Sequence, residues 1–127
     1  MFKGLGAGAP DVVYLTVSSD TNNYNLYDAA SHPALPVIVV CTVNSGVTVG
    51  HTAGLAAFRT GGRFATGSVL RLINNGRITG RGGDGGAGGS SPGVGSGNPG
   101  SAGSDGSTAI YLDDNLTVDN GGGYIVG

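Results

Sequence analysis

Short segments in which apolar and polar residues alternate recur along the chain, as in strands that bury one face. The alternation is clearest at residues 56–60 and 68–73. Residues 12–17 and 77–79 are rich in β-branched and apolar residues and are bounded by polar or glycine-containing turns. These four segments are therefore predicted to be β-strands.

Residues 37–43 form the longest apolar run and predict the strongest strand. The turn residues Asn-Ser-Gly at 44–46 separate this run from residues 47–49, which predicts a β-hairpin. Residues 24–30 fit either a strand or one short helical turn, because Leu26 and Ala30 lie four positions apart.

The end of the chain weakly repeats an earlier segment. INNG at residues 73–76 matches VDNG at 118–121, and the short apolar segments that follow also correspond after two extra residues. Strands are also predicted at 109–112 and 116–118. A repeat of about 45 residues suggests stacked β units, although two copies are fewer than the three that a stable solenoid needs.

These elements predict an all-β chain in which the first 79 residues form a small β-sandwich or barrel-like domain. So small a core favours oligomerisation. The predicted organisation is a flexible N-terminal arm at 1–10, a β domain at 11–79, a glycine-rich tract at 80–107 and a C-terminal β segment at 108–127.

The glycine-rich tract has a rough period of three. Seven of its glycines fall in one frame: Gly82, Gly85, Gly88, Gly97, Gly100, Gly103 and Gly106. Three residues per turn is the repeat of the extended left-handed helix, whose amides need neighbouring chains as partners. Packed polyglycine-type helices and a disordered linker are both open alternatives. If the helices pack, a side chain at Gly82 or Gly85 is expected to destabilise the tract.

Composition strengthens the β prediction. The 127 residues include 27 glycines, no Trp, no Glu and no Gln, so the usual residues of helix surfaces are nearly absent. A net charge of −2 argues against a nucleic-acid partner, and the arginines between Arg59 and Arg81 are expected to be solubilising. No apolar run is long enough to span a bilayer, and the N-terminus does not resemble a signal peptide.

Candidate chemistry is sparse. Cys41 lies in the apolar run and is expected to be a buried, inert thiol, while His32 and His51 are expected in turns or at the surface. Asp113-Asp114-Asn115 with Asp119 could bind calcium, but a solvated turn is favoured because the spacing matches no calcium loop. No catalytic residue, cofactor or metal site is predicted, and the chain is not expected to be an enzyme.

Two stretches, VNSGVTVG at 43–50 and SVLRLINNGRITGRGGDGG at 68–86, resemble the glycine-rich modules of phage central tail-fibre and host-specificity proteins. The segment from Tyr14 to Ala30 resembles the start of that module. The glycine tract is similar to the tail-fibre-tip adhesins of T-even-like phages, whose polyglycine helices carry receptor-binding loops. The resemblance implies a virion protein, assembled in the host cytoplasm and commonly trimeric, that contacts other virion proteins and a bacterial surface receptor or glycan.

Tyr24, Tyr27 and Tyr111 are the candidate receptor contacts, because tyrosine provides contact area at low entropic cost. Ordinary strand packing is the alternative role for all three. Two other functions also fit the sequence: a capsid-decoration or head-fibre protein without a receptor role, and an ice-binding or cell-surface glycine-helix protein.

Overall fold

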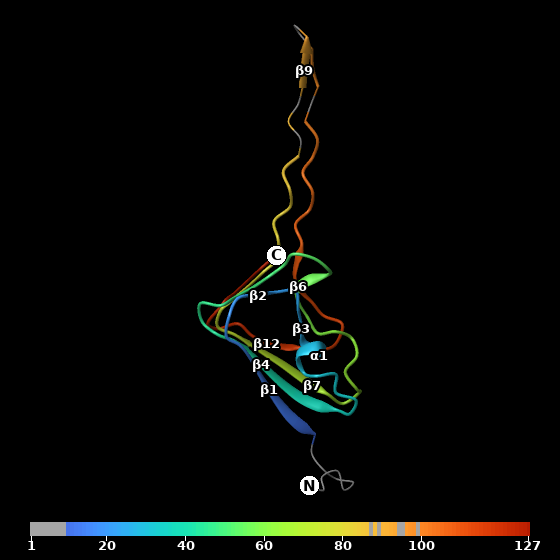
Figure 1. Ribbon diagram of the computed structural model, residues 1–127, viewed down its shortest axis with the longest axis vertical. Helices are drawn as coiled ribbons and strands as arrows, with labels where there is room; N and C mark the ends of the chain where they lie inside the picture. Colours follow the sequence, from blue (N-terminus) through green and yellow to red (C-terminus); the bar gives the residue numbers. More distant parts are fainter. Residues whose placement is uncertain (1–9, 87, 89, 94–95, 99) are drawn as a thin grey trace.

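The computed structural model describes residues 10–86, 88, 90–93, 96–98 and 100–127. The predicted N-terminal arm therefore lies outside the described residues, apart from Pro10. The described chain winds in successive passes around one core, and a slender two-stranded arm projects from that body (Figure 1). No helix among these residues is long and apolar enough to cross a membrane.

Three parallel sheets enclose the core, and each gains one strand per pass. The first sheet has the order β1 (Asp11–Val17), β4 (Val37–Val43), β7 (Val69–Asn74) and β12 (Thr117–Asp119). The second has the order β2 (Thr21–Asn22), β5 (Thr48–Gly50), β8 (Arg77–Thr79) and β13 (Tyr124–Val126). The third has the order β3 (Tyr24–Asn25), β6 (Ala56–Arg59) and β11 (Thr108–Tyr111). The all-β prediction is confirmed, with three sheets around one core rather than the two facing sheets of a sandwich.

Alternation along each strand builds the core. In β4 every second side chain is buried, from Val37 to Val43, because successive side chains of a strand point to opposite faces. All three sheets contribute to the same apolar cluster, with Val39 and Leu72 from the first, Ile78 from the second and Phe58 from the third. The thiol of Cys41 is in this core, as predicted, and is free and buried.

The predicted hairpin between residues 37–43 and 47–49 is wrong. β4 pairs in parallel with β1 on one edge and with β7 on the other, so neither edge is left for β5. The Asn-Ser-Gly turn instead leads the chain from the first sheet into the second. Gly46 has φ +82° there, and the N–H of Val47 donates to the carbonyl of Asn44 at 3.1 Å.

The weak internal repeat corresponds to stacked passes. Ile125 pairs with Ile78 and Val126 with Thr79, as the sequence alignment has it. In the preceding strands the true register is shifted by one, because Val118 pairs with Leu72 rather than with Ile73. With this register the later copy is one residue longer than the earlier one, and the extra residue lies in the corner between β12 and β13, where it leaves both pairings intact.

A buried asparagine holds this corner together. Asn74 is fully buried, and its Nδ2 donates to Asn120 Oδ1 at 2.8 Å and to the carbonyl of Tyr124 at 3.0 Å. Its Oδ1 accepts from the N–H of Gly76 at 3.2 Å. One side chain therefore satisfies polar groups of two successive passes, at a depth where water is excluded.

Residues 24–30 combine the two predicted conformations. β3 is followed directly by the short helix α1 (Leu26–Ala29). Asn25 caps this helix, since its Oδ1 accepts from the N–H groups of Tyr27 at 3.0 Å and Asp28 at 3.3 Å. The buried Leu26 anchors the turn in the core.

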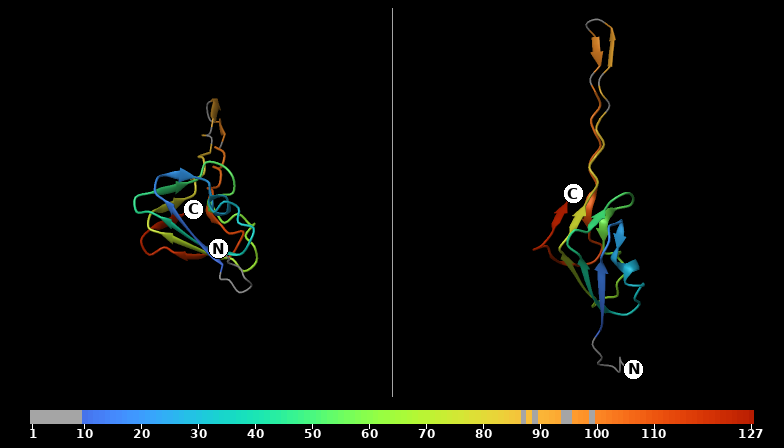
Figure 2. Two further views of the ribbon diagram at one scale, coloured as in Figure 1. Left: turned by 60° about the horizontal axis from the view of Figure 1, so that its bottom comes forward. Right: turned by 60° about the vertical axis from the view of Figure 1, so that its left-hand side comes forward.

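The glycine-rich tract leaves the body after β8 and returns to it at β11, and β9 (Ser90–Gly93) and β10 (Ser96–Asn98) pair antiparallel near its end (Figure 2). Its two sides are hydrogen-bonded at intervals of three residues. The N–H of Ser107 donates to the carbonyl of Arg81 at 2.7 Å, and the N–H of Ser104 donates to that of Asp84 at 2.8 Å. In return, the hydroxyls of both serines accept from the N–H groups of Arg81 and Asp84. This spacing matches that of packed polyglycine-type chains.

The glycines in close contact on the outgoing side are not those expected from the sequence. A Cβ added at Gly82, Gly85 or Gly88 meets nothing within 4 Å. In the neighbouring frame, a Cβ at Gly83 would lie 1.8 Å from the carbonyl oxygen of Ser104, and one at Gly86 would lie 1.7 Å from that of Ser101. The expectation for Gly82 and Gly85 is therefore wrong, because a side chain at either position would point into open space.

This geometry makes opposite predictions for adjacent glycines. Gly83→Ala should separate the two sides near Ser104, losing hydrogen bonds worth about 1 kcal/mol each. Amide exchange at Ser104 should accelerate by roughly tenfold. The matched control Gly82→Ala should leave that exchange rate unchanged, and equal acceleration in both variants would contradict the assigned contact.

The buried corner at Asn74 predicts that substitutions at two adjacent asparagines differ in their effect on stability. Asn74→Ala leaves the buried N–H of Gly76 without its acceptor and removes the donor to Asn120 and Tyr124, so it should lower the free energy of unfolding by about 2 kcal/mol or more. Asn75→Ala, in the same turn but exposed, should cost less than about 0.5 kcal/mol. Chemical denaturation measures both values, and a small loss for Asn74→Ala would show that water replaces the amide.

Candidate functional site

The third sheet presents one outward row of polar and aromatic side chains. Parallel register aligns Asn25 with Arg59, and Arg59 with Tyr111. Their neighbours Tyr24 and Phe58 are also paired in register and pack on the inner side, with ring centroids 5.5 Å apart. Because side chains alternate between faces, Asn25, Arg59 and Tyr111 share the outer face.

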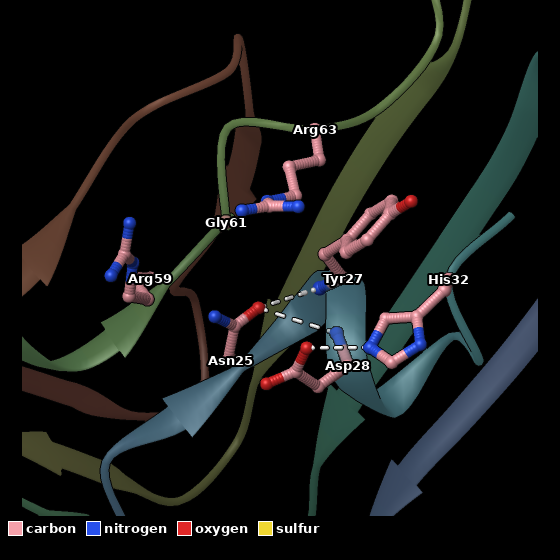
Figure 3. Close-up of a pocket in the computed structure, with 7 residues that line it drawn as sticks. All are labelled: Asn25, Tyr27, Asp28, His32, Arg59, Gly61 and Arg63. Atoms are coloured by element: carbon pink, nitrogen blue, oxygen red, sulfur yellow. Dashed lines mark hydrogen bonds and ion pairs between the residues drawn. The ribbon is translucent and has the colours of Figure 1, made fainter. Parts of the chain in front are cut away.

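Beside this row lies a solvent-open hollow of about 480 Å³ (Figure 3). Its lining is polar and charged apart from one aromatic ring and one glycine. The lining residues are Asn25, Tyr27, Asp28, His32, Arg59, Gly61 and Arg63. They come from β3, from α1 and the turn after it, and from the end of β6 with the loop that follows.

A close backbone approach shapes the floor of the hollow. Gly61 has φ +109°, and an added Cβ would lie 2.6 Å from Tyr27 Cβ and 2.7 Å from Asn25 Oδ1. Only glycine fits both the conformation and the space. The carbonyl of Thr60 also accepts from the N–H of Tyr27 at 3.1 Å, which fastens the loop after β6 to α1.

The turn after β11 fixes the other side of this loop. Asp113 Oδ2 accepts from Arg59 Nε at 3.1 Å and from Nη2 at 2.5 Å. Asp114 Oδ2 accepts from the N–H of Gly62 at 2.8 Å. The buried hydroxyl of Thr60 accepts from the N–H groups of both aspartates. Two of the three carboxylates considered for calcium, those of Asp113 and Asp114, thus bind protein donors here.

His32 lies at the surface in the turn after α1, whereas His51 is half-buried in the loop after β5. His32 is 63% exposed, and its Nε2 lies 2.8 Å from Asp28 Oδ1 in an exposed pair of little energetic weight. Its ring also lies 5.1 Å from that of Tyr27. His51 Nε2 lies 3.1 Å from the carbonyl of Gly54. Within the described ranges, no group of three or more His, Cys, Asp or Glu residues is arranged to hold a metal ion.

The three candidate tyrosines separate into different environments. Tyr24 packs in the core against Phe58, which leaves only part of its surface exposed. Tyr27 lines the hollow, where its ring contacts Phe64 edge-on at 5.2 Å. Tyr111 is 41% exposed and stands next to Arg59 in the outer row. Tyr27 and Tyr111 therefore flank one surface, and Tyr24 lies behind it.

Sequence reasoning missed Arg63 as a site residue and treated the central arginines as one solubilising group. Arg59 is held by Asp113, whereas exposed Arg63 has no ion pair within the described part of the chain. No local motif marks this difference. It arises from the turn at 113–114, which is more than 50 positions away in the sequence.

The core behind the surface contains two titratable groups in contact. The Cys41 thiol donates to the Tyr24 hydroxyl oxygen at 4.0 Å. Burial raises the pKa of the Cys41 thiol to about 11, and the contact with Tyr24 opposes this in part. Burial, followed by the neighbouring Cys41, raises the pKa of the Tyr24 hydroxyl above its ordinary value.

Comparison with known protein families gives a match over most of the chain. The sequence model described as "Phage tail fibre adhesin Gp38" matches residues 12–127. Comparisons with curated proteins and with solved structures found no match. The family match covers all three sheets, the hollow and the glycine arm.

The raised thiol pKa predicts how stability changes at alkaline pH. The folded chain holds the Cys41 proton up to about pH 11, whereas an ordinary thiol loses it near 9.0. The free energy of unfolding should therefore be unaffected by this group below pH 9 and fall by about 2 kcal/mol between pH 9 and 11. In Cys41→Ala that slope should flatten, with Tyr24 still contributing above pH 10. Parallel curves for both proteins in urea unfolding would contradict this assignment.

Proposed function

The chain belongs to the phage tail fibre adhesin Gp38 family, and on that basis we propose that it is a tail-fibre or tail-tip component that attaches to a receptor on the bacterial surface. The observation that carries this proposal is the family match, which runs from β1 to the end of the chain. The proposed activity is binding rather than catalysis, because the family is described by adhesion.

Two surfaces are suited to contact a receptor. The glycine arm projects well beyond the body, so its far end can reach a surface while the body remains at a distance (Figure 2). The outer row of the third sheet places Tyr111 beside Arg59, and Tyr27 of α1 lines the hollow next to this row. Aromatic and arginine side chains dominate the energetics of many interfaces, which makes this row the second candidate.

The proposal predicts where the chain lies and what it competes with. Gold-labelled antibody against the chain should decorate the distal end of the tail in electron micrographs of the source phage. The purified chain should bind the bacteria that this phage infects and should slow adsorption of the phage in proportion to the bound fraction. Bacteria that the phage does not adsorb to serve as the control.

Label over the head would contradict attachment and favour capsid decoration, and label on no particle would contradict a virion role. A variant without the glycine arm then distinguishes between the arm and the outer row of the third sheet as the receptor contact. A Cβ at Gly80 would lie 2.0 Å from the Ser107 carbonyl oxygen, so Asn-Gly can replace residues 81–106 without moving β8 or β11. Loss of binding in this variant assigns the receptor contact to the arm, and retained binding assigns it to the body.

A further inference from the structure

The hollow beside the third sheet has one charged group that the chain does not neutralise. Among its lining residues, Arg59 is paired with Asp113, and Asp28 with His32. Arg63 also lines the hollow, is exposed, and makes no ion pair or hydrogen bond within the residues that the structure describes. The hollow therefore contains an arginine whose guanidinium donors are all available.

The neighbouring groups also have unused hydrogen-bonding capacity. Asn25 Oδ1 is occupied by the cap of α1, but its Nδ2 donates to no protein group among the described residues. Asp28 has a second carboxylate oxygen beside the one that contacts His32. Figure 3 shows Arg63, Tyr27 and Asn25 on different sides of the hollow, with Arg59 opposite His32.

The ring of Tyr27 is held in a fixed position. Its centroid lies 5.1 Å from that of the tilted His32 ring and 5.2 Å from that of the nearly perpendicular Phe64 ring, and Gly61 packs against its Cβ. A fixed aromatic surface next to planar hydrogen-bonding groups suits a ligand that has apolar C–H faces and many hydroxyls. A sugar ring has both properties.

We propose that this hollow binds a saccharide carrying an anionic group, either a carboxylate or a phosphate. Arg63 binds the anion, since the guanidinium group matches both anions with two parallel hydrogen bonds. Asn25 Nδ2 and the free oxygen of Asp28 bind hydroxyls, and the Tyr27 ring contacts the sugar face. The volume falls within the roughly 300–1,000 Å³ of small-ligand sites, and the polar lining selects a hydrophilic ligand.

This inference rests on the proposed function, for which it names a class of ligand on the bacterial surface. A second hollow offers an internal comparison, because Arg77 lines it together with Tyr124 on the second sheet. Arg77 is likewise exposed and without an ion pair in the described part of the chain. Removing either arginine changes the net charge equally, but only Arg63 lies in the proposed site.

The test uses the full chain and four probes in isothermal titration calorimetry: glucose, glucuronic acid, glucose 6-phosphate and inorganic phosphate. At least one acidic sugar should bind with a millimolar dissociation constant, about tenfold or more tighter than glucose and than phosphate alone. Arg63→Gln should weaken that binding by about tenfold or more, and Arg77→Gln should leave it unchanged. Preference for glucuronic acid identifies a sugar acid, and preference for glucose 6-phosphate identifies a sugar phosphate.

Four outcomes would overturn the proposal: no acidic sugar binds, phosphate alone binds as tightly, both variants weaken binding equally, or only Arg77→Gln weakens it. Thermal melting of Arg63→Gln should match that of the parent chain, because the exposed side chain makes no hydrogen bond or ion pair among the described residues. Binding of the chain to host bacteria is measured in parallel. Cell binding without any sugar binding overturns the saccharide site alone, whereas absence of cell binding overturns the proposed adhesion.

Discussion

Each pass of the chain hydrogen-bonds to the pass before it in parallel and without a shift in register. Parallel strands lie about 4.8 Å apart, so equivalent residues of successive passes are stacked at that spacing. Apolar positions thereby form continuous inward rows, and polar positions form outward rows such as Asn25, Arg59 and Tyr111. The parallel register therefore determines both the apolar core on the inner faces of the sheets and the candidate site on an outer face.

The sequence predicted the strands well because alternation is a local property that each segment carries within itself. It failed on pairing, because the partners of β4 are β1 and β7 and not the adjacent β5. The sequence also pointed to the wrong glycines on the outgoing side of the arm. A period of three shows that every third residue is equivalent, but it does not show which of the three sets of positions contacts the returning side. Tyr27 was recognised as a candidate from its residue type. Arg63 was not, because its distinction from Arg59 depends on the distant Asp113.

The glycine arm is an insertion into the third pass of the winding. β8 belongs to the second sheet and β11 to the third, and the arm leaves and returns between them. A corner between two sheets tolerates an insertion because no strand pairing crosses it. β11 then resumes the pairing with β6 as if the tract were absent. The next corner, between β11 and β12, brings the turn at 113–114 onto the loop after β6, so the end of the third pass fixes a loop that lines the hollow.

The spacing of close contacts along the arm also divides its positions by how freely they can change. Gly83 and Gly86 are confined to glycine by the opposite backbone, whereas Gly82, Gly85 and Gly88 face open space. Larger side chains therefore fit at the open positions without disturbing the paired backbone. The surface chemistry of the arm can thus change by substitution at these positions while its backbone shape is kept, which is an advantage for a protein that must follow changes in its host.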